Sequence, residues 1–392
     1  MSQTLLDPVA TARSETGYFQ RKWPVYLIFG SFFFLTIPLC FLAGGDPGYL
    51  YRLSAGSVYL WMLGMTHFLI AFALYFQGAN LRYFASSPAN RATYFWLPAI
   101  IFVSFDLYHA LGIAVVLPTF DLVLRWAIRL ADFQHSTRQS FGVLQLFRMR
   151  SGCRFPNWVG RAENHYFTGV ALLLFVTFLS GGELRLERPA TQVVLAAVVG
   201  LFIWNLVGFA VAGFRSGSWT ALAAPFAYFL LQTCAAALAV YSTALYAFGL
   251  AMHYVEYHVL MAPRCFHTSL DKESRPDQFF GQFRRHKIVF YGLLLALAVP
   301  VMRFAWQGMS ELMRVDDSSL GLPSRVAISI FDGLFVFHYL IESRIWKFRD
   351  PYYRRTLIPL YFQAGASAES TTPDRPVAGN SVSESRHAAA VP

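Results

Sequence analysis

Apolar runs close to the length that crosses a bilayer recur along most of this chain. A helix needs about 20 apolar residues to cross roughly 30 Å of hydrocarbon. The candidate spans are Pro24–Gly44, Ser57–Gln77, Tyr94–Leu117, Phe120–Thr137, Tyr166–Ser180, Ala190–Gly213, Ala221–Tyr241, Leu245–Met261, Ile288–Phe304 and Val326–Ser343. The fourth is weak and could be an interfacial or re-entrant helix. The runs predict an all-α, polytopic membrane bundle of about eight to ten transmembrane helices.

The composition argues against a large soluble protein. Charged residues make up only 14% of the chain and apolar residues 56%, whereas a soluble surface usually needs about 25% charged residues. The apolar runs also lack the polar faces that helices around a soluble core would need. Arg21 and Lys22 precede the first run, but it is too long for a signal peptide and no small-residue cleavage site follows it.

The positions of lysine and arginine predict the orientation, because these residues gather in cytoplasmic loops. With the N-terminus inside, the cytoplasmic segments hold Arg13, Arg21, Lys22, Arg82, Arg91 and the basic residues of 138–161, 264–287 and 344–355. The opposite loops hold only Arg52, Arg185, Arg188, Arg303, Arg314 and Arg325. We therefore expect a multi-pass protein of the inner (cytoplasmic) membrane with both ends in the cytoplasm.

This topology divides the chain into three parts. They are a cytoplasmic N-terminal segment at 1–23, a transmembrane helical domain at 24–362, and a disordered tail at 363–392 that is rich in Ser, Ala, Thr and Pro. The net charge of +10 is interpreted as a topology signal, and no nucleic-acid-binding motif accompanies it. The absence of a P-loop and of a dinucleotide fingerprint argues against an ATP-driven pump.

Ionisable residues inside the predicted spans bear most directly on function. They cost energy in hydrocarbon, so they usually face the bundle interior and mark a site. Away from the span ends they are His67, Asp106, His109, Arg125, Arg129, Asp132, His135, His253, Glu256, His258, Asp332, His338 and Glu342. Neutral imidazole is the commonest protein ligand of transition metals. The histidines therefore predict a metal site, although polar residues hydrogen-bonded between helices could have the same composition.

The depth of the histidines supports a shared site. His135, His258 and His338 each precede a boundary arginine by three to six residues, which places them roughly 5–9 Å inside the cytoplasmic face. His67 and His253 lie nearer the midplane. Several helices thus bring imidazoles to overlapping depths, as a metal cluster would require.

The spacing along each helix decides which side chains can meet. His338 and Glu342 are four residues apart and share one face. His253 and His258 are five apart and diverge by roughly 140° on a regular α-helix, so they would reach one metal only through a π-bulge. Without the bulge, His253 pairs with Glu256 and His258 points elsewhere.

Arg138 and Gln139 follow His135 closely and could orient groups bound to the metal. The alternative is a helix end at the interface, with Arg138 reaching lipid phosphates. Earlier in the same segment, Arg125, Arg129 and Asp132 form one polar stripe. The stripe is either an internal ion-pair network or a surface that keeps this helix flat on the membrane.

Three segments resemble those of a family of multi-span bacterial membrane proteins with the patterns HxxRQxxG, HNxQYH and HYxxDxxIWKxR. The first pattern fits at His135, Arg138, Gln139 and Gly142, and the second keeps His253, Tyr257 and His258. The chain differs at Tyr254 and Glu256, where Asn and Gln are usual, and at Glu342, where Asp is usual. More loosely, histidines spread over several membrane helices resemble the bacterial membrane β-carotene cleavage dioxygenases, whose histidines hold a non-haem iron.

Two function classes follow. The first is a metal-dependent membrane oxidoreductase or oxygenase that acts on a lipophilic substrate and has membrane lipids and an electron-donor protein as partners. Its metal is non-haem iron, with haem or another transition metal as variants, and its predicted ligands are His67, His135, His253, His258, His338 and Glu342. Its predicted catalytic residues are Arg138, Gln139 and Glu256.

The second class is a proton-coupled transporter in which the same residues form a relay. A third possibility is a membrane assembly protein that catalyses no reaction.

Overall fold

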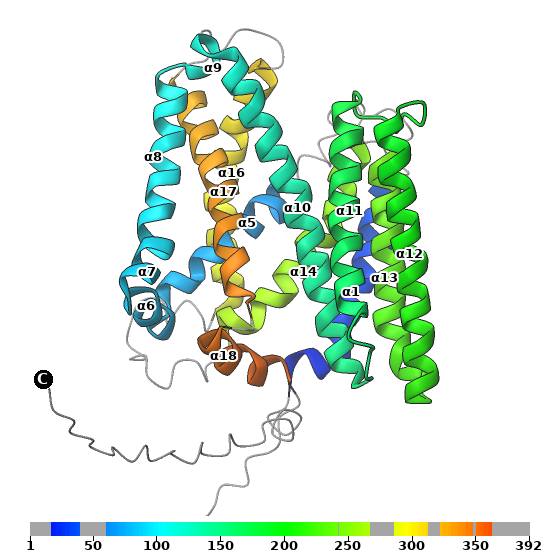
Figure 1. Ribbon diagram of the computed structural model, residues 1–392. Coiled ribbons are helices and arrows are strands. Elements are labelled where there is room, and N and C mark those ends of the chain that lie inside the picture. The colour runs from blue at the N-terminus through cyan, green and yellow to red at the C-terminus, as the bar shows by residue number, and fades with distance from the viewer. Residues whose placement is uncertain are drawn as a thin grey trace, which may run out of the picture.

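The computed structural model describes residues 17–39, 60–241, 243–266, 286–312, 322–347 and 350–362. These residues are almost entirely helical, which confirms the all-α fold. The predicted tail at 363–392 lies outside them, as do most of the N-terminal segment at 1–23 and the loop between the first two predicted spans. Figure 1 shows the helices standing side by side as a bundle.

Four helical segments are long and apolar enough to cross a membrane, as expected for a membrane protein. They are Lys22–Leu39, which contains α1 (Lys22–Ser31) and η2 (Phe32–Thr36), α11 (Val159–Leu179), α12 (Pro189–Ser216) and α13 (Trp219–Tyr241). The other predicted spans also fall on helices, namely η3 (Leu60–Met65), α5 (Thr66–Ile70), η4 (Ala71–Phe76), η5 (Ala92–Trp96), α8 (Leu97–Ala110), α9 (Ile113–Val116), α10 (Pro118–Ser151), α14 (Thr243–Phe266), α16 (Lys287–Leu312) and α17 (Leu322–Ile345). The shorter elements η1 (Tyr18–Gln20), α6 (Gly78–Ala85), α7 (Pro88–Arg91) and α18 (Pro351–Tyr361) lie outside the predicted spans or at their ends.

The weak fourth predicted span is the first half of α10, the longest described helix. α10 has 34 residues, or about 50 Å at 1.5 Å per residue. Proline stands at its start, where a missing N–H costs little. The helix ends at Gly152, whose φ of 66° suits a residue without a Cβ atom. α10 therefore runs the height of the bundle beside α11 and is not a short separate helix (Figure 1).

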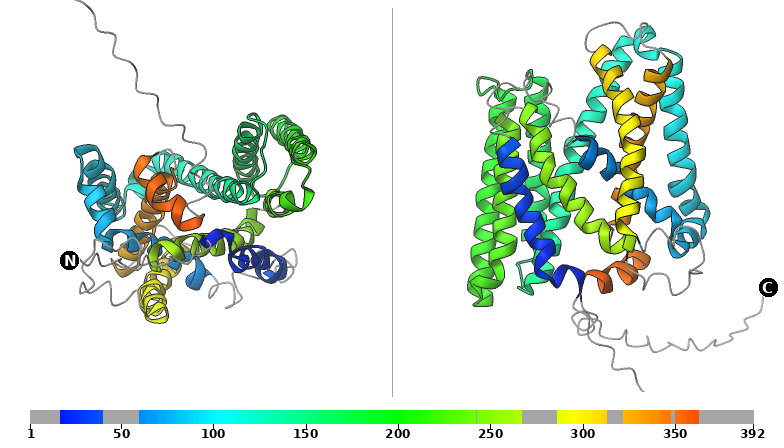
Figure 2. Two further views of the ribbon diagram at one scale, coloured as in Figure 1. Left: turned by 90° about the horizontal axis from the view of Figure 1, so that it is seen from below. Right: turned by 180° about the vertical axis from the view of Figure 1, so that it is seen from behind.

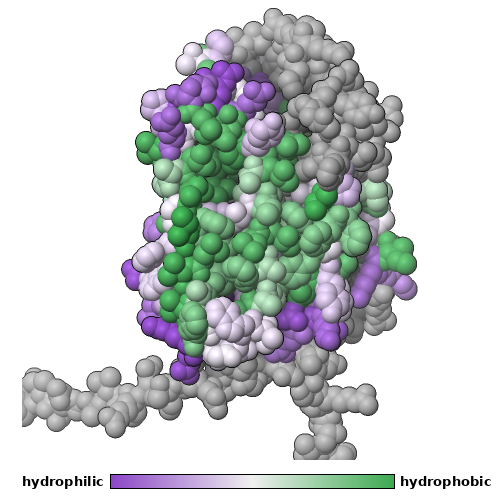
Figure 3. Space-filling view, turned by 90° about the vertical axis from the view of Figure 1, so that its right-hand side faces the viewer, coloured by the Kyte–Doolittle hydropathy of each residue, from purple (hydrophilic) through white to green (hydrophobic). Residues whose placement is uncertain are grey.

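The outer surface is apolar in the way that a lipid-facing surface requires. On α12 the side chains of Val193, Ile203 and Trp204 are 69%, 55% and 53% exposed. Figure 3 shows this side of the molecule as a hydrophobic band between polar ends. An apolar area of this extent is uncommon on soluble monomers.

The bundle has two parts, which α10 and α14 join. α11, α12 and α13 pack together in one part, whereas α8, α16 and α17 pack together in the other. α10 contacts α11 and α13 on one side and α17 on the other, and α14 contacts both α13 and α5. Both described ends of the chain lie at the same end of the bundle (Figures 1 and 2), where α18 packs against η1.

Candidate metal centre

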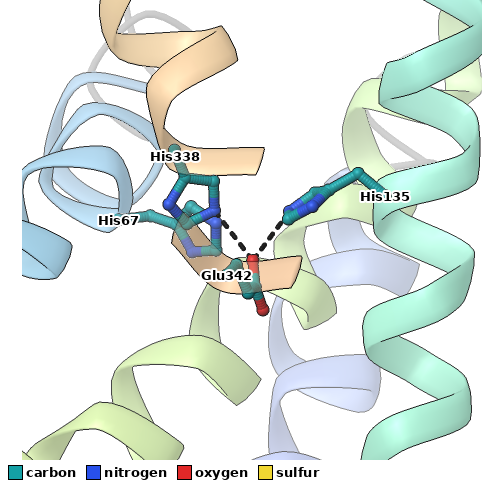
Figure 4. A group of neighbouring side chains, drawn as sticks. All are labelled: His67, His135, His338 and Glu342. Atoms are coloured by element: carbon teal, nitrogen blue, oxygen red, sulfur yellow. Dashed lines mark ion pairs between the residues drawn. The ribbon is translucent and has the colours of Figure 1, made fainter. Parts of the chain in front are cut away.

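Three histidines and one glutamate converge in the interior of the bundle. They are His67 of α5, His135 of α10, and His338 and Glu342 of α17 (Figure 4). Each offers one ligand atom, and these four atoms all lie within 4.8 Å of one another. Glu342 Oε2 is 2.9 Å from His135 Nε2 and 3.0 Å from His338 Nε2. The predicted alignment of His338 with Glu342 is thus present in the structure.

The group fits a single metal ion by size. Ligands on opposite sides of an ion with bonds near 2.1 Å lie about 4.2 Å apart, and neighbouring ligands lie closer. The distances of 2.9 Å and 3.0 Å from Glu342 Oε2 to the two histidine nitrogens are those of neighbouring ligands. The largest distance between any two of the four ligand atoms, at most 4.8 Å, is only slightly longer than the distance between opposite ligands. Small side-chain movements would therefore bring all four atoms into one coordination sphere.

The hydrogen bonding of the group also fits a metal. His67 and His338 are fully buried and Glu342 is 5% exposed. Within the described residues, both ring nitrogens of His67, Nδ1 of His338 and Oε1 of Glu342 lack a hydrogen-bond partner, whereas Glu342 Oε2 faces the Nε2 atoms of His135 and His338. Leaving a buried polar atom unpaired costs about 1–3 kcal/mol. Coordination to a cation would satisfy several of these atoms at once.

An irregular stretch of backbone carries His67. The chain passes from the π-helical turn η3 through one short α-helix, α5, into the 3₁₀ turn η4. It then bends by 77° into α6. Such departures from the α-helix occur often at functional sites, and in membranes they are tolerated where the backbone is buried in protein. The sequence identified His67 but not this distortion.

His253 lies at the edge of the group. Its ring centroid is 4.8 Å from that of His67 and 5.4 Å from that of His135, yet it is outside the four-residue set. Its Nδ1 is buried and lacks a hydrogen-bond partner among the described residues. His253 therefore borders the centre without belonging to the converging set.

His258 points elsewhere. α14 is a regular α-helix through this segment, without a π-bulge. His253 and His258 therefore diverge, as expected for a regular helix. His258 Nε2 lies 3.2 Å from Thr66 Oγ1 and 3.4 Å from the Leu63 carbonyl oxygen. Tyr257 instead approaches the centre, with ring centroids 4.2 Å from His67 and 4.9 Å from His338. Sequence reasoning gave Tyr257 no role.

The three predicted catalytic residues lie around the centre rather than in it. Arg138 is exposed and donates a hydrogen bond to Asn164 of α11. Gln139 Nε2 donates to the His253 carbonyl oxygen at 2.9 Å. Glu256 is buried and accepts from the Tyr228 hydroxyl at 2.9 Å and from Gln232 Nε2 at 2.6 Å. It does not pair with His253 as the spacing suggested.

Tyr339 supports His135 from one face. The two rings stack with centroids 4.0 Å apart and an interplanar angle of 23°. The Tyr339 hydroxyl donates to Asp132 Oδ1 at 2.6 Å, and Arg129 pairs with the other oxygen of that carboxylate at 3.2 Å. The predicted polar stripe is thus partly an ion-pair network. Tyr339 directly follows His338 in the sequence, but only the fold reveals that it contacts His135.

Comparisons with known proteins assign the centre no role. No family model matches it, and comparisons with curated proteins and with solved structures return no match. The resemblance to histidine-rich bacterial membrane proteins therefore remains a prediction, and the function must be argued from the site.

Proposed function

We propose that this protein is a metal-dependent oxidoreductase or oxygenase that acts on a lipophilic substrate within the bilayer. One observation carries the proposal. Three imidazoles and one carboxylate from three helices converge within 4.8 Å in the bundle interior, with buried atoms that lack partners among the described residues. Polar residues that only join helices would leave few buried atoms unpaired, whereas here both ring nitrogens of His67 and Oε1 of Glu342 have no hydrogen-bond partner among the described residues.

Non-haem iron is the metal we propose. A set of imidazoles with one carboxylate is typical of non-haem Fe(II), although zinc, copper and nickel also accept imidazole. Haem fits less well, because a porphyrin needs a flat slot between its axial ligands. Here the carboxylate of Glu342 occupies the space between His135 and His338.

The protein side of the chemistry is orientation and exclusion of water. When bound, iron would supply open coordination positions and one-electron redox chemistry. Glu342 would provide the negative charge and hold two histidines at fixed distances. Tyr339 stacks on His135 and is itself fixed by Asp132, which holds the ring orientation in the way that hydrogen-bonded partners of metal ligands do.

We also propose the inner membrane as the location, with both ends of the chain in the cytoplasm. The support is the excess of Lys and Arg in loops on one side. Electrons would then come from a donor protein at the cytoplasmic end. The lipophilic substrate would come from the membrane lipids around the apolar surface.

Lipid analysis tests the proposed activity. We expect lipid extracts of cells that produce the wild-type protein to contain species enriched in one or two oxygen atoms. The same species should fall to the background level with Glu342→Ala, which keeps the helix but removes a ligand. His165→Ala is the matched control, because His165 is exposed on α11. Identical lipid profiles for wild type and Glu342→Ala would contradict an oxygenase.

A proton-coupled transporter is the second candidate, and two observations favour it. The segment η3–α5–η4–α6 is broken, as helices at transporter sites often are. His109 Nε2 also lies 3.0 Å from Asp332 Oδ2, which adds an ion pair to the one formed by Arg129 and Asp132. Proton uptake by protein-containing vesicles, coupled to solute flux and abolished by Asp332→Asn without loss of metal, would select this function.

A further inference from the structure

The first half of α10 is not packed into the bundle. The buried residues of this helix all lie between Asp132 and Phe147. Residues 118–131, about 21 Å of helix, are exposed or half-buried throughout. Among them the side chains of Phe120 and Val123 are 51% and 54% exposed. In the membrane setting proposed above, this half of the helix contacts lipid.

Two arginines on this half keep hydrogen-bond donors that no described residue uses. Arg125 donates from Nε to both carboxylate oxygens of Asp121 at 2.8 Å, and Arg129 Nη1 donates to Asp132 at 3.2 Å. A guanidinium has five N–H donors, so each arginine has others left. Donors that meet no acceptor in apolar surroundings are costly. These two side chains therefore suit acceptor oxygens from outside the chain.

The arginines lie toward the end of the bundle opposite to α18 and η1. The guanidinium carbon of Arg129 is 5.6 Å from the ring centroid of Phe178, the next-to-last residue of α11. Arg125 is one turn nearer to the start of α10, at that same end (Figure 1). Arginine side chains near the end of a span reach the level of the lipid head groups. The unused donors are thus within reach of head groups in that leaflet.

A row of aromatic rings on α17 leads to the metal centre. Phe331, Phe335 and Tyr339 are spaced four residues apart and share one face. Their ring centroids are 6.2 Å and 4.3 Å apart, and all three are half-buried. The last ring stacks on the ligand His135 and bonds to Asp132, the carboxylate that also pairs with the second arginine. The row and the arginines therefore meet at the same place.

We propose that the substrate of the centre is an acyl chain of an intact phospholipid, whose phosphate group binds Arg125 and Arg129 and whose chain follows the first half of α10 toward His135. The proposal rests on the function above, since it names the substrate class. Asp121 and Asp132 offset the two positive charges, so the phosphate is recognised by the match of its oxygens to the guanidinium forks. Arg129 precedes His135 by six residues, or about 9 Å along the helix, which an acyl chain spans easily.

Photolabelling tests the lipid site directly. The probe is a phospholipid with a diazirine in mid-chain, used on the full chain in lipid nanodiscs and mapped by peptide mass spectrometry. We expect labels on α10 between Phe120 and Gln134 and on α17 between Phe331 and Tyr339, relative to α12 as the reference for general lipid contact. A diacylglycerol with the same chains lacks the phosphate and should give a ratio about tenfold lower. Equal ratios for both probes, or labels spread evenly over α10, α12 and α17, would overturn the proposal.

Variants of the two arginines provide a second measurement. The Arg125→Gln, Arg129→Gln double variant should lower the ratio for the phospholipid probe about tenfold and leave the ratio for the diacylglycerol unchanged. Arg215→Gln is the matched control, because Arg215 is exposed at the last turn of α12. An unchanged phospholipid ratio in the double variant would contradict the proposal. If that variant does not fold, the comparison of the two probes on wild-type protein still decides.

Failure of the lipid site and failure of the metal site give different results. In His338→Ala, the phospholipid probe should still label α10 and α17, because neither arginine has changed. Preferential labelling without bound metal or oxygenated lipid in wild type would keep the lipid site and reject the oxidoreductase. Oxygenated lipids without preferential labelling would reject the lipid site alone.

Discussion

At the residue scale, the spacing of the polar side chains along each helix governs which of them reach the candidate centre. The i,i+4 spacing of His338 and Glu342 follows from helix geometry alone, and the structure places them 3.0 Å apart. The five-residue spacing of His253 and His258 left their directions open, because the answer depends on whether α14 contains a π-bulge. The contact of Tyr257 with His67 depends on packing between distant segments, which no local pattern reveals.

His258 and His67 should therefore differ in their effect on metal content. His67→Ala removes one of the four converging groups, so we expect most of the bound metal to be lost. His258→Ala removes only contacts to Thr66 and Leu63, so we expect near wild-type metal content. Metal analysis of both purified variants checks this. Metal loss in His258→Ala but not in His67→Ala would show that His258, and not His67, is the ligand.

Tyr339 should act through His135 rather than as a ligand. Tyr339→Phe keeps the stacked ring but removes the bond to Asp132, which should lower the free energy of unfolding by about 1 kcal/mol with little loss of metal. Tyr339→Leu also removes the stack, so metal affinity should fall about 10–100-fold. Metal titration of the two variants separates the effects, and equal affinity in both would show that the stack has no positioning role.

At the element scale, the apolar runs predicted where most of the described helices lie, and four of the described helical segments are long and apolar enough to cross a membrane. The prediction was less informative for α10, whose many polar residues weaken the hydropathy signal over a helix of 34 residues. It did not reveal the succession of π, α and 3₁₀ turns around His67, because tertiary contacts and not local propensity stabilise these turns. The least regular element thus carries a central ligand.

Close packing of α8 against α17 should hold the His338–Glu342 segment in place. A Cβ atom on Gly333 would come within 2.5 Å of the Phe102 ring. Gly333→Leu should therefore cost about 1–3 kcal/mol through overpacking and lower the thermal midpoint in detergent. Gly200→Leu on α12 is the control, because nothing lies within 4 Å of its Cβ position. A midpoint shift as large in the control as in Gly333→Leu would contradict this account.

At the scale of the whole molecule, the fold brings both described ends to one side of an apolar bundle. The positive-residue rule predicts that this side is cytoplasmic. Reporter domains fused before Gly17 and after Phe362 should both show activity typical of the cytoplasm, whereas a reporter in the loop between α11 and α12 should show the opposite location. Opposite locations for the two ends would reject the predicted topology.

The arrangement of the whole molecule also indicates how a substrate would reach the candidate centre. The candidate metal centre lies at the junction of the two helical parts, and apolar side chains are exposed on the outer surface of the bundle. A soluble substrate would have to cross an apolar surface, whereas a lipid has direct access to it. The bilayer is thus part of the proposed mechanism as well as the location of the protein.

Metal stoichiometry of the purified protein is the most direct test of the candidate metal centre. We expect about one iron ion per wild-type chain after purification in detergent, with the metal site formed by His67, His135, His338 and Glu342. We expect almost none in a His338→Ala, Glu342→Ala double variant that remains folded, and wild-type content in His165→Ala. A folded wild-type protein that binds no transition metal, even after incubation with Fe(II), would contradict it.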